Sequence, residues 1–225
     1  MSQTWRHILF AHWPVPKAAL APHIPAPLAL DESEGSAWVT FAAMRIDSMR
    51  PLERFQTPLL SPFAQVNVRT YVRFRGRPGI FFVSSEAASA VSAAGGRLFF
   101  DLPYWYSNVS LSEGKGRIDF HMARRTVEGP ALFKCAYQPS GPARLTRPGS
   151  LDHWLLERYS QFTTKEGKVG RSDVVHAPWQ VSPARADIGA FTLPQRLGLT
   201  LSGPPRTLHY AARQDARIGR LVMVS

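Results

Sequence analysis

The segment that decides the fold reads Val66-Asn67-Val68-Arg69-Thr70-Tyr71-Val72-Arg73-Phe74. Side chains of two kinds alternate in it over nine residues, which is the period of a strand with one mainly apolar and one mainly polar face. Gly76-Arg77-Pro78-Gly79 follows as a turn signal, and the apolar run at residues 80–83 comes next. The two runs and the turn between them predict a β-hairpin.

Nineteen prolines and sixteen glycines divide the rest of the chain into short segments, which favours strands and short helices over a helical bundle. We expect helices at residues 14–20, 85–94 and 151–159 and a further helical piece after Pro183. We expect strands at residues 8–13, 37–46, 98–102, around 109, and at 117–122, 131–137, 174–181, 208–212 and 221–224. Because no repeat or linker interrupts this pattern, it predicts a single mainly β domain over residues 1–225, built as an antiparallel barrel with a few short helices.

The chain is basic, with 27 Lys and Arg against 16 Asp and Glu in 225 residues and a formal net charge of +11. A chain of this length buries roughly 70% of its unfolded surface, so it forms a core without disulfides, and Cys135 is its only cysteine. The densest basic patch comprises Arg69, Arg73, Arg75 and Arg77, which a nucleic-acid or anionic-surface binder could use. The other basic residues are dispersed, which disfavours nucleic acid as the partner.

Several functional classes have no signal in the sequence. No run of about 18 apolar residues predicts a membrane span, and residues 1–7 lack the apolar region of a secretion signal, so we expect a cytoplasmic protein. Glycine-rich phosphate loops, paired-histidine metal motifs and a nucleophile elbow are also absent. We therefore expect no cofactor and no metal site.

The segment at residues 19–30, Ala-Leu-Ala-Pro-His-Ile-Pro-Ala-Pro-Leu-Ala-Leu, resembles one near the start of acetoacetate decarboxylases. The resemblance places Arg6 where those enzymes carry an active-site arginine, and Gln65 where they carry a glutamate. Residues 96–104, Gly-Arg-Leu-Phe-Phe-Asp-Leu-Pro-Tyr, keep the spacing of the pattern that ends on their Schiff-base lysine. Tyr104 stands in the place of that lysine.

Four motifs in order make the chain similar to the YqjF-like bacterial family, which is grouped with the acetoacetate decarboxylase superfamily. They are Asn67-Val68-Arg69-Thr70-Tyr71-Val72, Leu102-Pro103-Tyr104, the segment from Pro148 to Tyr159, and His176-Ala177-Pro178-Trp179. This resemblance implies an acetoacetate decarboxylase-like β-barrel or cone with an internal ligand cavity.

The expected site combines the resemblance with strand alternation. A phenol forms no imine, so we expect no Schiff-base decarboxylation with Tyr104 in the lysine's place. If Gln65 faces the cavity, alternation predicts Asn67, Arg69 and Tyr71 as further ligand-binding residues on the same face. We expect Arg6 to hold a carboxylate by a bidentate contact. Beside that cation the pKa of Tyr104 would fall below its usual value of about 10, so that Tyr104 could donate a hydrogen bond or act as a general acid.

Three hypotheses follow. In the first, the protein binds a small carboxylate or oxo-acid and, if it is an enzyme, is a cofactor-independent lyase or hydrolase that stabilises an enolate or oxyanion through Arg6 and Tyr104. In the second, it is a non-catalytic small-molecule binding barrel, favoured by the loss of the lysine and of the carboxylate base. In the third, the patch from Arg69 to Arg77 binds a polyanion. A homo-oligomer is compatible with each of them.

Overall fold

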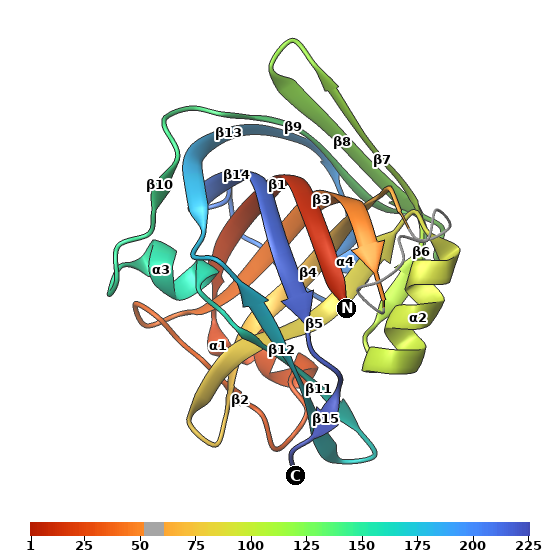
Figure 1. Ribbon diagram of the computed structural model, residues 1–225, viewed down its shortest axis with the longest axis vertical. Helices are drawn as coiled ribbons and strands as arrows, with labels where there is room; N and C mark the ends of the chain where they lie inside the picture. Colours follow the sequence, from red (N-terminus) through yellow and green to blue (C-terminus); the bar gives the residue numbers. More distant parts are fainter. Residues whose placement is uncertain (52–60) are drawn as a thin grey trace.

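Fifteen strands form one hydrogen-bonded sheet in the computed structural model, which describes residues 1–51 and 61–225 (Figure 1). The long strands are β1 (Ser2–Val15), β3 (Ala37–Arg50), β4 (Phe63–Phe74), β5 (Arg77–Ala87), β13 (Gln180–Phe191) and β14 (Thr207–Ile218). The shorter strands are β2 (Ala29–Leu30), β6 (Tyr104–Tyr106), β7 (Asn108–Gly114), β8 (Arg117–Arg124), β9 (Ala131–Pro139), β10 (Arg144–Leu145), β11 (Ser160–Lys165), β12 (Lys168–His176) and β15 (Val222–Met223). The helices are α1 (Lys17–Leu20), α2 (Ala90–Phe100), α3 (Leu151–Leu156) and α4 (Leu193–Arg196), with a 3-10 turn at Ala21–His23.

Seven of these strands form a closed ring. Strand β14 pairs with β1 on one side and with β12 on the other, so the order β12-β11-β5-β4-β3-β1-β14 returns to its start. Every pair in the ring is antiparallel except β5 with β11. The mainly β class with a few short helices is therefore confirmed, and Figure 1 shows the ring strands surrounding the centre of the molecule.

The alternation along β4 separates two hydrophobic cores. Val66 and Val68 lie on the outer face of the ring, in the core that also contains Phe120 of β8 and Phe133 of β9. Residues of the opposite parity, such as Tyr71, belong to a second core inside the ring. The sheet of β7, β8, β9 and β13 thus covers one outer side of the ring and leaves its interior separate.

The β4–β5 hairpin turns earlier than the sequence predicts. The strands end at Phe74 and begin again at Arg77, so the turn consists of Arg75 and Gly76, with φ of 49° and 79°. Positive φ at both positions matches the right-handed twist of a hairpin. Gly79 lies in β5 instead, where an added Cβ would come within 2.6 Å of the Ser160 carbonyl oxygen, so this glycine allows the close approach of β11.

Several expected elements differ from those observed. The helix expected at residues 85–94 is α2, which begins after Ser89, whose side chain accepts a hydrogen bond from the Ser92 amide as an N-cap. Residues 98–100, expected in a strand, complete this helix, and the segment after Pro183 continues β13 instead of forming a helix. The helix expected from Leu151 is α3, which ends at Leu156. None of the helices in the described ranges is long and apolar enough to cross a membrane.

Candidate functional site

A cavity of about 930 Å³ lies inside the ring of strands. Each of the seven ring strands contributes at least one residue to its wall, and helix α2 lines one side. Apolar side chains make up most of this wall, among them Phe10, Met44, Phe63 and Phe82. The interior of the fold is therefore a cavity large enough for a small-molecule ligand, and its lining is mainly apolar.

Strand β4 supplies a row of polar side chains to this wall. Gln65, Asn67 and Arg69 all line the cavity, in the arrangement that the alternation predicts. All three residues are buried, and the Asn67 Oδ1 atom has no hydrogen-bond partner. Their role in ligand binding stays a prediction, but the structure brings them together in one cavity.

Arg69 is the most unusual of the three, because it is a buried cation without an acid. Its residue is 8% exposed, its Nε atom has no hydrogen-bond partner, and no carboxylate in the described ranges forms an ion pair with it. Its guanidinium lies 5.0 Å from the centre of the Phe10 ring. Burial lowers the pKa of Arg69, while the adjacent Tyr71 hydroxyl raises this pKa again. An arginine keeps its proton even so, and the cavity therefore contains an uncompensated positive charge.

Tyr104 lies beside Gln65, as the resemblance to the decarboxylases implies. Its hydroxyl donates to Gln65 Oε1 at 3.4 Å, and its ring lies against α2, where a Cβ on Gly96 would come within 2.5 Å of Tyr104 Cδ2. Burial raises the pKa of Tyr104 to about 12. The expectation of a lowered pKa is wrong, because the desolvation of the phenol outweighs the opposing effects of Gln65 and Ser85. Tyr104 stays protonated near neutral pH and serves as a hydrogen-bond donor.

Arg6 lies outside the cavity. Its Nε atom pairs with Asp47 Oδ2 at 2.5 Å, and its side chain is 40% exposed in a surface hollow. The pairing of β1 with β3 shifts after Arg6, where His7 has a φ of 52°. This bulge reverses the alternation, so that Trp5 before it and Phe10 after it both face the cavity. Arg6 therefore does not line the cavity, whereas Arg69, Arg158 and Arg220 do, and of these Arg69 is the buried one without an acid partner.

Tyr71 is on the predicted face but below the cavity floor. It is fully buried, does not line the cavity, and packs against Trp154 with ring centres 4.6 Å apart. The Arg158 guanidinium lies 5.1 Å from its ring centre. Tyr71 thus supports the floor and does not reach a ligand directly.

A chain of hydrogen-bonding side chains begins at Tyr71, next to Arg69, and reaches the surface through Thr40, His12, His209 and Asp152. The Tyr71 hydroxyl is 2.6 Å from Thr40 Oγ1, which is 2.8 Å from His12 Nδ1. His12 Nε2 is 3.2 Å from His209 Nδ1, and His209 Nε2 is 3.1 Å from Asp152 Oδ1. With His12 and His209 each donating from Nε2, every group from Tyr71 onward can donate toward Asp152. The hydrogen bonds then all run from the side of Arg69 toward the Asp152 carboxylate, and they spread part of the positive charge of Arg69.

The predicted basic patch does not form one surface. It consists of Arg69, Arg73, Arg75 and Arg77. Arg69 is inside the ring, whereas Arg73 pairs with Asp31 at 2.7 Å and Arg77 pairs with Asp173 at 3.1 Å. The hypothesis of a polyanion-binding patch therefore loses the continuous basic face that it requires.

Sequence reasoning missed several polar residues of the wall, among them Arg158 and His176, and also Gln3, Ser92, Gln161 and Arg220. Arg158 follows α3, and its charge is compensated by Asp31 at 2.7 Å. His176 lies 5.1 Å from Trp179, measured between ring centres. Both belong to motifs that carry the family resemblance. Those motifs were the only sequence feature that pointed to these two residues.

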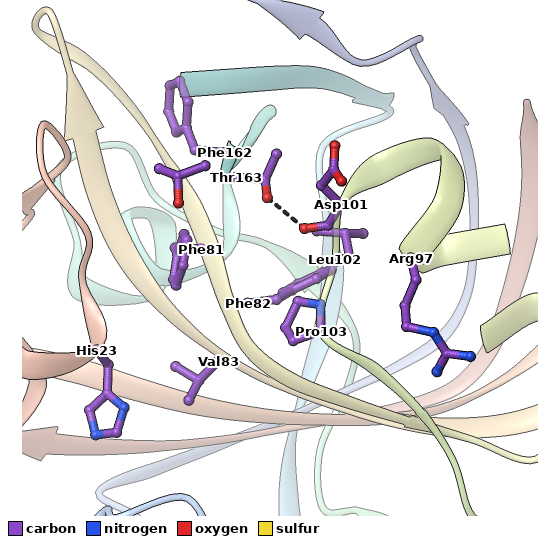
Figure 2. A pocket seen from close by; sticks show the side chains of 11 residues that line it. His23, Phe81, Phe82, Val83, Arg97, Asp101, Leu102, Pro103, Phe162 and Thr163 are labelled. Atoms are coloured by element: carbon purple, nitrogen blue, oxygen red, sulfur yellow. Dashed lines mark hydrogen bonds between the residues drawn. The ribbon is translucent and has the colours of Figure 1, made fainter. Parts of the chain in front are cut away.

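A smaller hollow of about 510 Å³ lies on the other side of β5, between β5, β11 and the segment after α2 (Figure 2). Phe82 and Leu102 line both spaces. Two of its polar residues are already engaged, since Thr163 Oγ1 donates to the Asp101 carbonyl oxygen at 2.7 Å and Lys165 pairs with the Asp101 carboxylate. This hollow offers no unpaired buried charge, so the cavity inside the ring is the better candidate site.

The cavity wall contains no lysine in the described residues. The chain has five, Lys17, Lys115, Lys134, Lys165 and Lys168, and all are exposed. In the same described ranges, no group of three or more His, Cys, Asp or Glu side chains could hold a metal ion.

Comparisons with known proteins place this geometry in a family. The model of the DUF2071 family, described as an uncharacterized conserved protein, matches residues 2–215. The chain belongs to the DUF2071 family. It is 36% identical over 215 residues to the uncharacterized protein YqjF of Bacillus subtilis, which covers 96% of this chain and 88% of that protein. The predicted membership in a YqjF-like family is confirmed.

Solved structures with the same fold include acetoacetate decarboxylases and other enzymes. The acetoacetate decarboxylase of Legionella pneumophila superposes with a TM-score of 0.68 at 12% identity, over 100% of this DUF2071 chain and 87% of that chain. The enduracididine biosynthesis enzyme MppR, complexed with pyruvate, gives a TM-score of 0.67 at 13% identity over 100% and 90%. An acetoacetate decarboxylase-like enzyme from Sphingomonas wittichii gives 0.66 at 13% over 100% and 92%. The acetoacetate decarboxylase-like fold is confirmed by these likenesses.

The contact between Tyr104 and α2 predicts opposite effects of alanine at two adjacent glycines. At Gly95 an added Cβ meets only Phe99, at 3.9 Å, so Gly95→Ala should stabilise the helix by about 0.5–1 kcal/mol. At Gly96 the same Cβ collides with the Tyr104 ring, so Gly96→Ala should lower the melting temperature despite the same gain in helix propensity. Thermal unfolding of the two variants measures this difference. Equal melting temperatures would show that Tyr104 does not pack on Gly96.

Buried histidines predict a loss of stability in mild acid. Burial, with smaller contributions from His209 and Arg69, holds the pKa of His12 well below its ordinary value, and burial also lowers the pKa of His7 and His176. The unfolded chain therefore binds more protons than the folded one below about pH 6.5, and the free energy of unfolding falls as pH decreases. Each such group contributes up to about 1.4 kcal/mol per pH unit until its folded pKa is reached.

A His12→Gln variant tests this assignment by chemical denaturation between pH 5 and 8. We expect it to be less stable than the wild type at pH 8 but to lose less stability on acidification. His121→Gln, which changes an exposed histidine, should keep the wild-type profile. An unchanged slope in His12→Gln would contradict the assignment.

Proposed function

We propose that this protein binds a small carboxylate or oxo-acid in the cavity, with the carboxylate on Arg69. The observation that carries the proposal is the buried guanidinium without an acid partner. A buried charge is costly unless it is paired, and an anionic ligand supplies the missing partner. Arg69 replaces Arg6 as the carboxylate-binding arginine, while Gln65, Asn67 and Tyr104 contribute hydrogen bonds beside it.

Similar folds support a small acid as the ligand class. MppR, a structural neighbour, is complexed with pyruvate, which is an oxo-acid. An oxo-acid bound on Arg69 would direct its remaining polar groups toward Asn67 and Gln65, and the protonated Tyr104 could stabilise charge that develops on a carbonyl oxygen. If the protein is an enzyme, we propose a cofactor-independent lyase or hydrolase that forms no Schiff base.

Binding without turnover is the second candidate function. It is favoured by the pKa of Tyr104, because a phenol with a pKa of about 12 is a poor general base near neutral pH. Incubation with acetoacetate and pyruvate separates the two functions. An acid that raises the melting temperature but is recovered unchanged supports binding alone.

Replacement of the unpaired arginine tests the proposed function most simply. In Arg69→Met we expect hexanoate, pyruvate and acetoacetate to bind at least tenfold more weakly in titration calorimetry, because a charge-assisted hydrogen bond contributes roughly 1.5–3 kcal/mol. The melting temperature should not fall, since the variant removes an uncompensated buried charge. Arg6→Met is the matched control and should bind these acids as the wild type does. Unchanged affinity in Arg69→Met would contradict the proposal.

Treatment with a reductant tests the absence of an imine. We expect borohydride with acetoacetate to leave the wild-type mass unchanged, because all five lysines are exposed and none lines the cavity. Mass spectrometry of the intact chain and of its peptides detects any adduct. A stoichiometric adduct on one lysine would show that imine chemistry occurs.

A further inference from the structure

The cavity is much longer than a three-carbon acid. Phe63 and Arg69, at the two ends of a row of alternate β4 residues, both line it. Arg69 is six residues along the strand from Phe63, which at a rise of about 3.3 Å per residue corresponds to roughly 20 Å. A ligand of pyruvate's size on Arg69 would therefore leave most of the 930 Å³ unfilled by protein or ligand.

The two ends of the cavity differ in exposure. The Arg69 end is closed, because Arg69 and the Phe10 ring beneath it are buried. Strand β6 pairs with residues 85–87 of β5, and Ala87 in turn pairs with Gln65 of β4, so β6 and the adjoining α2 stand toward the Phe63 end. Seven lining residues are themselves exposed and mark the opening: Val91, Ala94, Leu98 and Phe99 belong to α2, and Pro51, Gly219 and Arg220 complete its rim.

The α2 side of this opening is apolar, whereas Arg220 lies among the other exposed lining residues. Val91, Leu98 and Phe99 of α2 all line the cavity, and they are 54%, 73% and 67% exposed. Large apolar side chains gathered at an opening usually mark a surface that a ligand or partner covers. Because these three side chains continue the cavity wall, the same ligand can reach them from inside.

Apolar side chains also flank the polar row between the two ends. Phe82 pairs across from Arg69 on β5, and Met44 pairs across from Gln65 on β3; both line the cavity. A ligand whose carboxylate binds Arg69 thus has apolar side chains around the rest of the molecule. These side chains favour a hydrocarbon chain over water, and the favourable path for that chain runs along β4 toward Phe63.

We propose that the ligand of this cavity is an elongated amphiphilic carboxylic acid, with its carboxylate on Arg69 and its apolar body along β4 to the α2 opening. This inference rests on the proposed function and specifies its ligand class. It predicts that affinity increases about fourfold for each methylene group that the cavity takes out of water.

Titration calorimetry with unbranched acids tests the proposal on the full-length protein. The probes are pyruvate, hexanoate, octanoate and decanoate, all below their micelle-forming concentrations, with octan-1-ol as the neutral counterpart of octanoate. We expect one site per chain, an affinity that rises about tenfold or more with each two-carbon step, and octan-1-ol binding at least tenfold more weakly than octanoate.

A double variant at the opening tests the direction of the chain. Leu98→Gln with Phe99→Gln changes two exposed side chains, so the fold should be retained, and we expect decanoate to lose at least fivefold in affinity while hexanoate changes less than twofold. Val127→Gln is the matched control, because Val127 is exposed and lies outside the cavity lining. It should leave both affinities unchanged.

The outcomes separate this inference from the function on which it rests. Pyruvate binding as tightly as decanoate, with both weakened in Arg69→Met, would overturn the amphiphilic ligand and leave the acid-binding function intact. An unchanged decanoate affinity in the double variant would overturn the path toward α2 and with it the inference. Failure of every acid to bind, or octan-1-ol binding as tightly as octanoate, would overturn the proposed function itself.

Discussion

A guanidinium group that has lost its water needs other groups to balance its charge, and Arg69 has no carboxylate to do so in the residues that the structure describes. Its neighbours are an aromatic face, a phenol hydroxyl and a second arginine whose own charge is balanced by Asp31. The hydrogen-bonded chain to Asp152 spreads the charge over a distance but does not cancel it locally. The arrangement is therefore costly without an anion and favourable with one.

The closed ring of strands makes this arrangement possible. Pairing of β14 with both β1 and β12 encloses a space that is too wide for side chains to fill, and the sheet of β7, β8, β9 and β13 supplies a separate core on the outside. Stability can thus come from the outer core while the interior keeps a cavity. The bulge at His7 decides which arginine faces that cavity, because it turns Arg6 outward and Phe10 inward.

Periodicity in the sequence was sufficient for the mainly β class, the hairpin and the shared face of Gln65, Asn67 and Arg69. It was insufficient for Arg6, because one residue in a bulge reverses every later side chain and leaves no mark in the alternation. Composition misplaced α2, since its N-cap is Ser89 and its alanines begin a helix that runs on through Phe100. The pKa of Tyr104 is set mainly by burial, and Arg6, the cation expected beside it, lies outside the cavity. No local sequence pattern could predict this pKa.

The central claim is that Arg69 is completed by the carboxylate of a ligand inside the ring. A crystal structure of the protein grown with octanoate measures this directly. The account predicts density for one octanoate in the cavity, with a carboxylate oxygen within about 3.2 Å of the Arg69 guanidinium nitrogens. Octanoate bound at Arg6 or elsewhere on the surface, with Arg69 left unoccupied beside an empty cavity, would contradict it.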